Sequence, residues 1–169
     1  PSFPNTATPS ASESNAANLL YLDPLDPAIR KIGAPFLAQA LVSVPELKAQ
    51  FIARNQELTG AGYHAQVHVD AKTSLFFMLE KGERATLRLR DTEYAALAER
   101  AEQVSPNALL RPVWQDYLLP TVAYVGGPGE LAYLAQSEVA YRHLLGRMPV
   151  AMSRNGFTVL DARSQKLLN

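Results

Sequence analysis

The spacing of apolar residues along the chain predicts alternating helices and strands from about residue 19 onward. In five segments apolar residues recur every three or four positions, which is typical of amphipathic helices. These predicted helices cover residues 27–41, 44–58, 92–104, 114–119 and 128–145. Short apolar or alternating runs predict strands at residues 19–22, 63–69, 75–79, 84–89, 121–125 and 150–160.

Capping residues mark the starts of several of these helices. Asp26 followed by Pro27 fits an N-cap and a first helical position. Ser43 with Glu46 three residues later resembles a capping box. Asp91 fits the N-cap of the third helix.

The first predicted helix contains two residues that disfavour helical structure. Gly33 and Pro35 lie inside residues 27–41, so we expect them to weaken or bend this element. The apolar stripe of the same helix consists of Ile29, Ile32, Phe36 and Ala40.

Together these elements predict an α/β fold with a mixed sheet and a β-hairpin. The hairpin turns at Lys81 and Gly82. Residues 1–18 are rich in Pro, Ser, Asn, Thr and Ala, which predicts a flexible segment before the core at 19–160. Residues 161–169 are typical of a helix cut off after about two turns, so we expect the chain to be a fragment.

Composition narrows the function classes. The 169 residues are 47% apolar, which allows one domain with a real core, and the 16 basic residues balance 16 acidic ones. A nucleic-acid partner is therefore disfavoured. The chain has no cysteine, no apolar run of about 18 residues and no signal-peptide pattern. We expect a cytoplasmic protein without a membrane span.

The best candidate site follows the strand at 121–125. Gly126, Gly127 and Gly129 surround Pro128 just where the long helix begins. The glycines either form a backbone cradle for a phosphate or carboxylate, or satisfy the sterics of a tight turn. Glu130 either binds a ligand amine or hydroxyl, or caps the helix start, where a carboxylate meets backbone N–H groups.

A polar trio precedes that strand. Arg111, Gln115 and Asp116 lie on or just before one short helix that is otherwise apolar. Unpaired buried polar groups cost about 1–3 kcal/mol each, so the trio either faces a cleft or pairs internally. Tyr124 either points to the same pocket or packs in the core.

Three further residues complete the predicted site. Tyr133 and Gln136 share a face of the long helix, where they either line the crevice or contact the sheet. Arg154 either clamps a carboxylate or pairs with an internal acid.

Other polar residues predict no metal site or catalytic group. His64 and His68 would lie about 13 Å apart along a strand, too far for one ion. The sequence contains no nucleophilic triad, paired-carboxylate site or zinc signature that defines a catalytic residue.

Four blocks of the sequence resemble the BshC family of bacillithiol biosynthesis, the proposed cysteine ligases. The two later blocks are LLRPVWQDYLLPTVAYVGGPGELAYLAQ at residues 109–136 and GRMPVAMSR at 146–154. The two earlier blocks are LYLDPLDPAIRKIGAPF at 20–36 and SLFFMLEKGERATLRLR at 74–90, which are similar to the middle region of that family.

The resemblance implies a Rossmann-like, three-layer, nucleotide-binding core and a coiled-coil arm that makes a homodimer. It implies amide (C–N) bond formation between cysteine and glucosaminyl malate, with ATP or ADP as the expected nucleotide. The family signatures T-G-Q-Q-x-G-x-x-x-G-P and E-D-H-D do not occur in this sequence, and Ser153 replaces the usual Pro before Arg154. We therefore expect the fragment alone to be inactive.

Two other hypotheses remain open from the sequence. The chain is either a non-catalytic nucleotide-binding module or a purely structural α/β domain, in which case the glycines and polar residues serve packing and capping.

Overall fold

The computed structural model describes residues 22–80, 83–87, 89–158 and 161. Its helices are α1 (Pro27–Val42), α2 (Val44–Gly60), the 3-10 helix η1 (Asp91–Gln103), α3 (Arg111–Leu118) and α4 (Pro128–Leu145). Its strands are β1 (Phe76–Glu80), β2 (Glu83–Thr86), β3 (Val104–Pro106), β4 (Ala123–Gly126) and β5 (Val150–Ser153). Among the helices of the described ranges, none has the length and apolar character needed to cross a bilayer.

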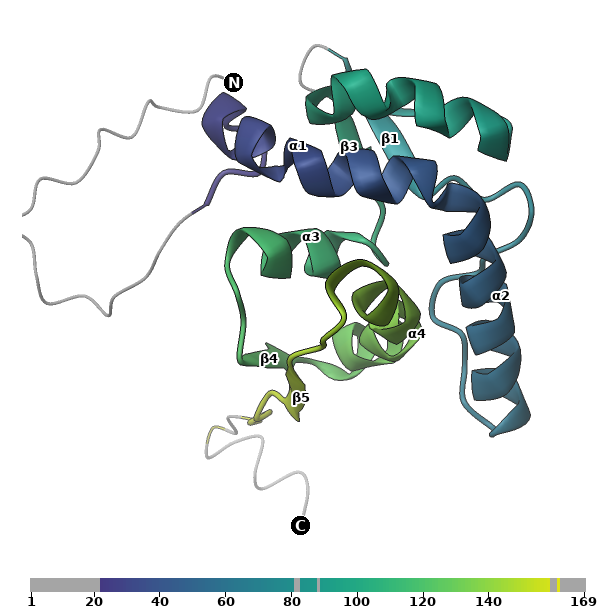
Figure 1. The fold of residues 1–169 in the computed structure, drawn as a ribbon. Coiled ribbons are helices and arrows are strands. Elements are labelled where there is room, and N and C mark those ends of the chain that lie inside the picture. Colours follow the sequence, from purple (N-terminus) through teal and green to yellow (C-terminus); the bar gives the residue numbers. More distant parts are fainter. Residues whose placement is uncertain (1–21, 81–82, 88, 159–160, 162–169) are drawn as a thin grey trace, which may run out of the picture.

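The strands form two small sheets at opposite ends of the described fold (Figure 1). In the first sheet β1 lies between β2 and β3 and pairs antiparallel with both. In the second, β4 and β5 are parallel, with Ala123 opposite Val150 and Val125 opposite Met152. The helix α4 connects these two parallel strands. The predicted α/β class, with both strand orientations and a hairpin, is confirmed.

The helix α1 runs between the two halves, with η1 on one side and α3 and α4 on the other (Figure 1). Its backbone at Gly33 lies directly against the indole of Trp114 in α3. The Arg30 guanidinium stacks over the same indole, 5.1 Å from the ring centroid, and donates to the carbonyl oxygens of Glu102 and Val104. Desolvation by burial, followed by the nearby Arg84 charge, lowers the pKa of Arg30. These contacts fix α3, which carries three predicted site residues, Arg111, Gln115 and Asp116.

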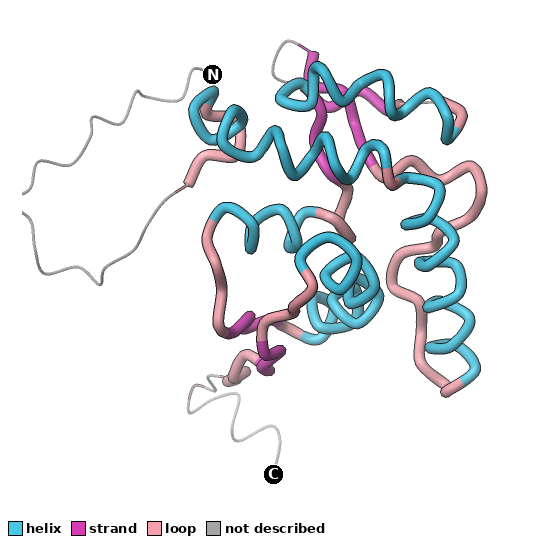
Figure 2. Tube along the Cα trace, in the orientation of Figure 1, coloured by secondary structure: helices cyan, strands magenta, loops and turns pink. Residues whose placement is uncertain are grey.

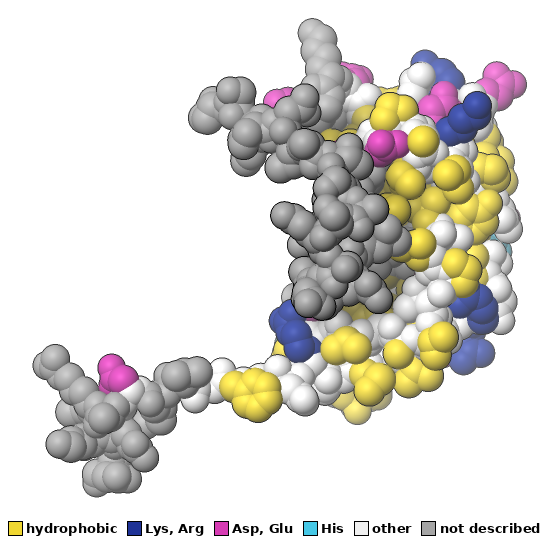
Figure 3. Space-filling model, turned by 90° about the vertical axis from the view of Figure 1, so that its left-hand side faces the viewer, with side chains coloured by type: hydrophobic (Ala, Val, Ile, Leu, Met, Phe, Trp, Pro, Cys, Tyr) yellow, Lys and Arg dark blue, Asp and Glu magenta, His cyan; other side chains and the backbone are white. Residues whose placement is uncertain are grey.

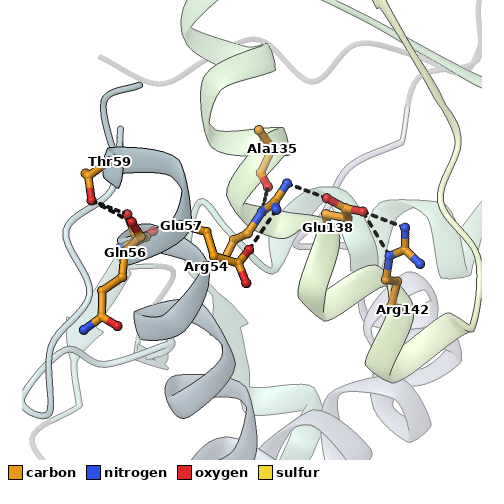
Figure 4. A network of polar contacts seen from close by, with 8 residues as sticks. Arg54, Gln56, Glu57, Thr59, Ala135, Glu138 and Arg142 are labelled. Atoms are coloured by element: carbon orange, nitrogen blue, oxygen red, sulfur yellow. Dashed lines mark hydrogen bonds and ion pairs between the residues drawn. The ribbon is translucent and has the colours of Figure 1, made fainter. Parts of the chain in front are cut away.

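The helix α4 is held against α2 by a polar network (Figure 4). The Arg54 guanidinium lies 2.6 Å from Glu138 Oε2 and 3.0 Å from Glu57 Oε2, and its Nε donates to the Ala135 carbonyl. Glu138 also accepts from Arg142. On another side of α4, the buried Tyr141 hydroxyl donates to the carbonyl oxygen of Pro112 in α3, at 2.9 Å. Contacts with α2 and with α3 therefore hold α4 in its direction and determine where its first turn lies.

The strand predicted at residues 63–69 is wrong, although exposure does alternate from residue 64 to residue 69. Tyr63, predicted on the same side as Val67, is exposed. The segment bends at Gln66 and Val67, runs beside α2 (Figure 2) and pairs with no strand among the described residues. The fully buried Gln136 side chain of α4 accepts from the Val67 N–H and donates to the Val67 carbonyl. Asn55 of α2 also donates to that carbonyl. Because the side chains of Gln136 and Asn55 form hydrogen bonds with the backbone of Val67, these groups do not need a neighbouring strand as partner.

Several predicted element ends also differ. Asp26 caps α1 as predicted, since its carboxylate accepts from the N–H groups of Ala28 and Ile29. Ser43 makes no side-chain cap, because this single residue ends α1 and starts α2. The 3-10 helix begins at Asp91 itself, and Glu93 accepts from the preceding N–H of Arg90 at 2.7 Å.

Two strands differ from their predictions in extent or burial. The turn at 105–106, expected to close a helix, belongs to β3. The strand β4 is only partly buried, because α4 covers one side of the parallel pair.

One residue of the apolar stripe predicted on α1 is not buried: Ile32 is exposed. The predicted flexible segment 1–18, nearly all of the strand at 19–22, the hairpin turn 81–82 and residues 162–169 lie outside the described residues.

Candidate functional site

The candidate site is the first turn of α4, directly after β4. Gly127 is the N-cap, and its N–H donates to Glu130 Oε2 at 2.9 Å. Pro128 has no N–H, and the N–H groups of Gly129 and Glu130 meet no acceptor among the described residues. Unpaired N–H groups at the positive end of a helix dipole attract anions.

Glycine occupies the three positions of this turn for different structural reasons. A Cβ at Gly126 would lie 3.1 Å from Glu130 Cβ and 3.2 Å from Tyr124 Cε1, and one at Gly127 would lie 2.8 Å from Arg154 Nη2. Packing against Glu130 and Tyr124 therefore explains Gly126, whereas a side chain at Gly127 would meet only the end of the flexible Arg154 side chain, which it would displace. At Gly129 a Cβ would meet nothing within 4 Å, so the described fold itself does not require glycine there.

Arg154 supplies the positive charge beside this turn. Its backbone N–H donates to the Gly126 carbonyl at 2.8 Å, which places it at the carboxyl end of the parallel pair. Its guanidinium is 66% exposed and reaches Glu130 Oε2 only at 3.9 Å, a loose ion pair. Such an exposed guanidinium can exchange Glu130 for the carboxylate or phosphate of a ligand at little cost.

The turn and Arg154 border an open hollow of about 600 Å³, which we call the α4 hollow. Its lining comprises Gln66, Gly127, Pro128, Gly129, Glu130, Tyr133 and Arg154. Gln66 was not predicted as a site residue. Its place on the polar side of the alternating segment 63–69 was the only sequence signal for it.

A second hollow of about 340 Å³, the α3 hollow, lies between the start of the described chain and α3. It is lined by Leu22, Pro24, Arg111, Trp114, Gln115, Leu118 and Leu119. A hydrogen-bonded chain links the two hollows: Arg111 Nη2 donates to the Tyr133 hydroxyl at 3.5 Å, and that hydroxyl lies 3.3 Å from the Tyr124 hydroxyl. Arg111 and Gln115 thus face one hollow, while Tyr133 lines the other.

Two predicted site residues lie elsewhere. Asp116 is buried, forms an ion pair with Arg147 at 2.8 Å and accepts from the Thr121 N–H at 2.5 Å. Gln136 is fully buried against Val67 and Asn55. Both are engaged by internal partners, and internal pairing was the alternative left open for Asp116. Neither residue lines a described hollow. Within the described residues, no cluster of three or more His, Asp or Glu side chains is placed to hold a metal ion.

The Tyr124 hydroxyl, which lies against the Tyr133 hydroxyl, is held in its protonated, uncharged form. Burial, and then the hydrogen bond with Tyr133, raise the pKa of Tyr124 above its ordinary value. Because the folded pKa is raised, the stabilisation from this hydroxyl is complete below the unfolded pKa of about 10 and is lost as pH rises beyond it.

This gives a test by alkaline titration. At a pH just above 10, the deficit in tyrosinate absorbance of native Tyr124→Phe against native wild-type protein should be smaller than in strong denaturant, since the raised pKa keeps Tyr124 more protonated in the folded state. In denaturant the variant should lack one tyrosine's share of the signal. A native deficit as large as the denatured one would contradict the shift.

Comparison with known proteins identifies the family of this chain. Residues 15–155 match the family model described as "Bacillithiol biosynthesis BshC, N-terminal Rossmann-like domain". The chain belongs to the BshC family. The Rossmann-like class implied by the sequence blocks is thereby confirmed.

Family relatives from three bacteria are each named "Putative cysteine ligase BshC". The protein of Solibacter usitatus is 54% identical over 158 residues, which are 88% of this chain and 30% of that protein. The proteins of Koribacter versatilis and Prosthecochloris aestuarii are 37% and 30% identical, over 89% of this chain and 31% and 30% of their own lengths. The chain spans about a third of the length of these relatives.

Proposed function

We propose that this chain is the Rossmann-like part of a cysteine ligase of bacillithiol biosynthesis, and that its α4 hollow binds an anionic group of the reactants. The observation that carries the proposal is the pair of unpartnered N–H groups at Gly129 and Glu130 beside the exposed Arg154. The names of the relatives support the ligase class. The same proposal places the protein in the cytoplasm and assigns homodimer formation to a coiled-coil arm outside this chain.

The proposed reaction joins the carboxylate of cysteine to the amine of glucosaminyl malate. Amide formation from a carboxylate is uphill in water, so activation by ATP would be needed. A carboxylate oxygen would attack a phosphorus of ATP, the P–O bond to the ADP or pyrophosphate leaving group would break, and a mixed anhydride would form. The amine nitrogen would then attack the acyl carbon and lose a proton to solvent as the C–N bond forms, and the phosphate-bearing group would leave with the electron pair of the broken C–O bond. Both steps concentrate negative charge on phosphate oxygens, which preorganised donors stabilise.

The residues of this chain would act as electrostatic and positioning groups. The N–H groups at the α4 start and Arg154 would hold a phosphate or carboxylate in the α4 hollow. Arg111 and Gln115, in the α3 hollow, would hold a second polar part of a reactant. Glu130 caps Gly127 and Asp116 is paired with Arg147, so we assign neither as general acid or base.

Titration calorimetry of the full-length protein with ATP and ADP tests this proposal. We expect Gly127→Val and Arg154→Gln to weaken binding about tenfold or more, because a charge-assisted hydrogen bond contributes about 1.5–3 kcal/mol. The valine acts by displacing the Arg154 guanidinium, which its Cβ would otherwise approach to 2.8 Å. Arg90→Gln is the matched control, because Arg90 is exposed and pairs with Glu93 on η1. Equal affinity of all four proteins would refute the anion site.

A non-catalytic nucleotide-binding module is the second candidate. It is favoured by one observation: the acidic residues of the predicted site, Glu130 and Asp116, are both engaged in internal contacts. This candidate predicts nucleotide binding by the full-length protein without consumption of ATP in the presence of cysteine and glucosaminyl malate. Release of ADP or AMP dependent on both reactants would exclude it.

A further inference from the structure

Asp116 of α3 is a buried carboxylate that has no assigned role in the proposed reaction. Its side chain is 1% exposed, and its Oδ2 lies 2.8 Å from Arg147 Nη1. Its Oδ1 accepts from the Thr121 N–H at 2.5 Å, and Arg147 Nη2 donates to the Asp116 carbonyl at 3.5 Å. A buried charge is unfavourable unless it is well paired, so the place of these two partners is informative.

The two partners of Asp116 lie on the two segments that lead into the parallel strands. Thr121 belongs to the segment between α3 and β4, and Arg147 to the segment between α4 and β5. Where these segments enter the pair, the Val150 N–H donates to the Val122 carbonyl at 2.9 Å. Val122 directly follows Thr121, and Val150 comes three residues after Arg147. One carboxylate therefore holds both segments just before their pairing begins.

The register of β4 against β5 determines where Arg154 lies. Gly126 is opposite Ser153, and the Arg154 N–H donates to the Gly126 carbonyl at 2.8 Å. Sliding β5 by one residue along β4 would move Arg154 by about 3.3 Å and turn the side chains of β5 to the other side of the pair. The present register places the Arg154 guanidinium on the border of the α4 hollow, beside Glu130.

Side-chain burial does little to fix this register within the described residues. All four residues of β5 are exposed. Figure 3 shows hydrophobic side chains at the surface of the lower end of the molecule, where β4 and β5 lie in Figure 1. Register is strongly specified where one face of a strand is buried and weakly specified where it is not. A polar contact at the entry of the pair can supply what burial does not.

We propose that Asp116 is a positioning residue of the α4 hollow. Through Thr121 and Arg147 it sets the register of β4 against β5, and it thereby holds Arg154 beside the first turn of α4. Asp116 itself touches no reactant. The proposal rests on the proposed function only for the role of Arg154 in binding, because the register is a property of the unliganded protein.

Disulfide formation between introduced cysteines reads the register directly, in full-length protein whose other cysteines are replaced by serine. Val125→Cys with Met152→Cys is the in-register pair, because these exposed residues are opposite each other. Val125→Cys with Val150→Cys is the displaced pair, since Val150 lies two residues, or about 6.6 Å, further back along β5. A disulfide needs Cα atoms about 4.4–6.8 Å apart, so the displaced pair closes only when β5 slides. The measured quantity is the ratio of the in-register to the displaced rate.

This ratio should fall when Asp116 loses its contacts. We expect a fall of about tenfold in Asp116→Ala, the effect of one charge-assisted hydrogen bond. Asp116→Asn, which keeps an acceptor for the Thr121 N–H but not the charge, should give an intermediate ratio. Arg147→Lys should stay closer to wild type than Arg147→Met, because lysine keeps the cation.

Tyr141→Phe is the matched control for a general loss of stability. The buried Tyr141 hydroxyl joins α4 to the Pro112 carbonyl of α3 and contacts neither segment that leads into the strands. The control should therefore keep the wild-type ratio. An equal fall in Tyr141→Phe would overturn the proposal, and so would an unchanged ratio in Asp116→Asn and Arg147→Met.

Titration calorimetry with ADP connects the register to the α4 hollow. We expect Asp116→Ala to weaken ADP binding about tenfold, and Arg154→Gln to add little on that background, because residues that act through one another are not additive. Fully additive losses would overturn the statement that Asp116 acts through Arg154. Absence of ADP binding by wild-type protein would contradict the proposed function, whereas the disulfide ratio would still decide whether Asp116 sets the register.

Discussion

Replacing Gly33 by alanine should destabilise the protein, although the same change inside a helix normally stabilises it. A Cβ at Gly33 would lie 2.7 Å from Trp114 Cε2 and 2.9 Å from Trp114 Cζ2, and still closer to the indole nitrogen. The buried indole cannot easily retreat, because the Arg30 guanidinium stacks over its ring. We expect overpacking to cost about 1–3 kcal/mol, which exceeds the gain of up to about 1 kcal/mol in helix propensity.

Denaturant unfolding would measure this effect, and Gly60→Ala is the matched control. Gly60 is the last residue of α2, and a Cβ there would meet nothing within 4 Å. The control should be neutral or slightly stabilising. Trp114 is the one tryptophan of the 169 residues. In an otherwise tryptophan-free background its emission should shift to longer wavelength in Gly33→Ala only. A Gly33→Ala protein as stable as wild type would show that α1 and α3 are not in contact through this glycine.

Gly33 also illustrates what the sequence could and could not predict. The helix containing it was predicted correctly, because the cap at Asp26 and the apolar spacing are local signals. From the sequence alone, Gly33 and Pro35 could be interpreted only as residues that weaken the helix. The reason for the glycine is a tryptophan about 80 positions later in the chain, and no local pattern contains that contact.

The same distinction applies to the candidate site. The turn after β4 was predicted almost residue by residue, since Gly127, Pro128 and Glu130 act within one helical turn. The grouping of Arg111 with this turn was predicted only in outline. It depends on the hydroxyl of Tyr133, which joins the α3 and α4 hollows. Whether these residues bind a reactant stays a prediction.

Gln136 shows the opposite case, a residue whose polar character suggested a ligand but whose partners are internal. Its spacing from Tyr133 placed both on one helical face. In the structure Tyr133 lies at the edge of the α4 hollow, while Gln136, one turn further, is fully buried. The Gln136 amide takes the place of a neighbouring strand for the 63–69 segment, which is why the predicted strand is absent and why this side chain contacts the backbone instead of lining a described hollow.

The second large effect should therefore come from Gln136→Leu. Leucine would leave the Val67 N–H and Asn55 Oδ1 without a partner, whereas the Val67 carbonyl would keep its bond from Asn55. Each buried polar group left unpaired costs about 1–3 kcal/mol, so we expect a loss of about 2–4 kcal/mol in the free energy of unfolding. Ser137→Ala is the control, because Ser137 is equally buried and its hydroxyl only donates to a carbonyl of its own helix. We expect the control to lose about 1 kcal/mol or less.

The part of the chain that is destabilised distinguishes the loss of the Gln136 hydrogen bonds from a general loss of packing. Native-state hydrogen exchange should become faster over residues 63–70 in Gln136→Leu, while the amides of α1 keep their protection. Because Gln66 belongs to this segment and lines the α4 hollow, nucleotide binding should weaken in the same variant if that hollow is the anion site. Uniformly faster exchange across the chain would contradict a local anchoring role. Loss of protection at 63–70 with unchanged nucleotide affinity would show that the segment's attachment to α4 is structural and that Gln66 takes no part in binding.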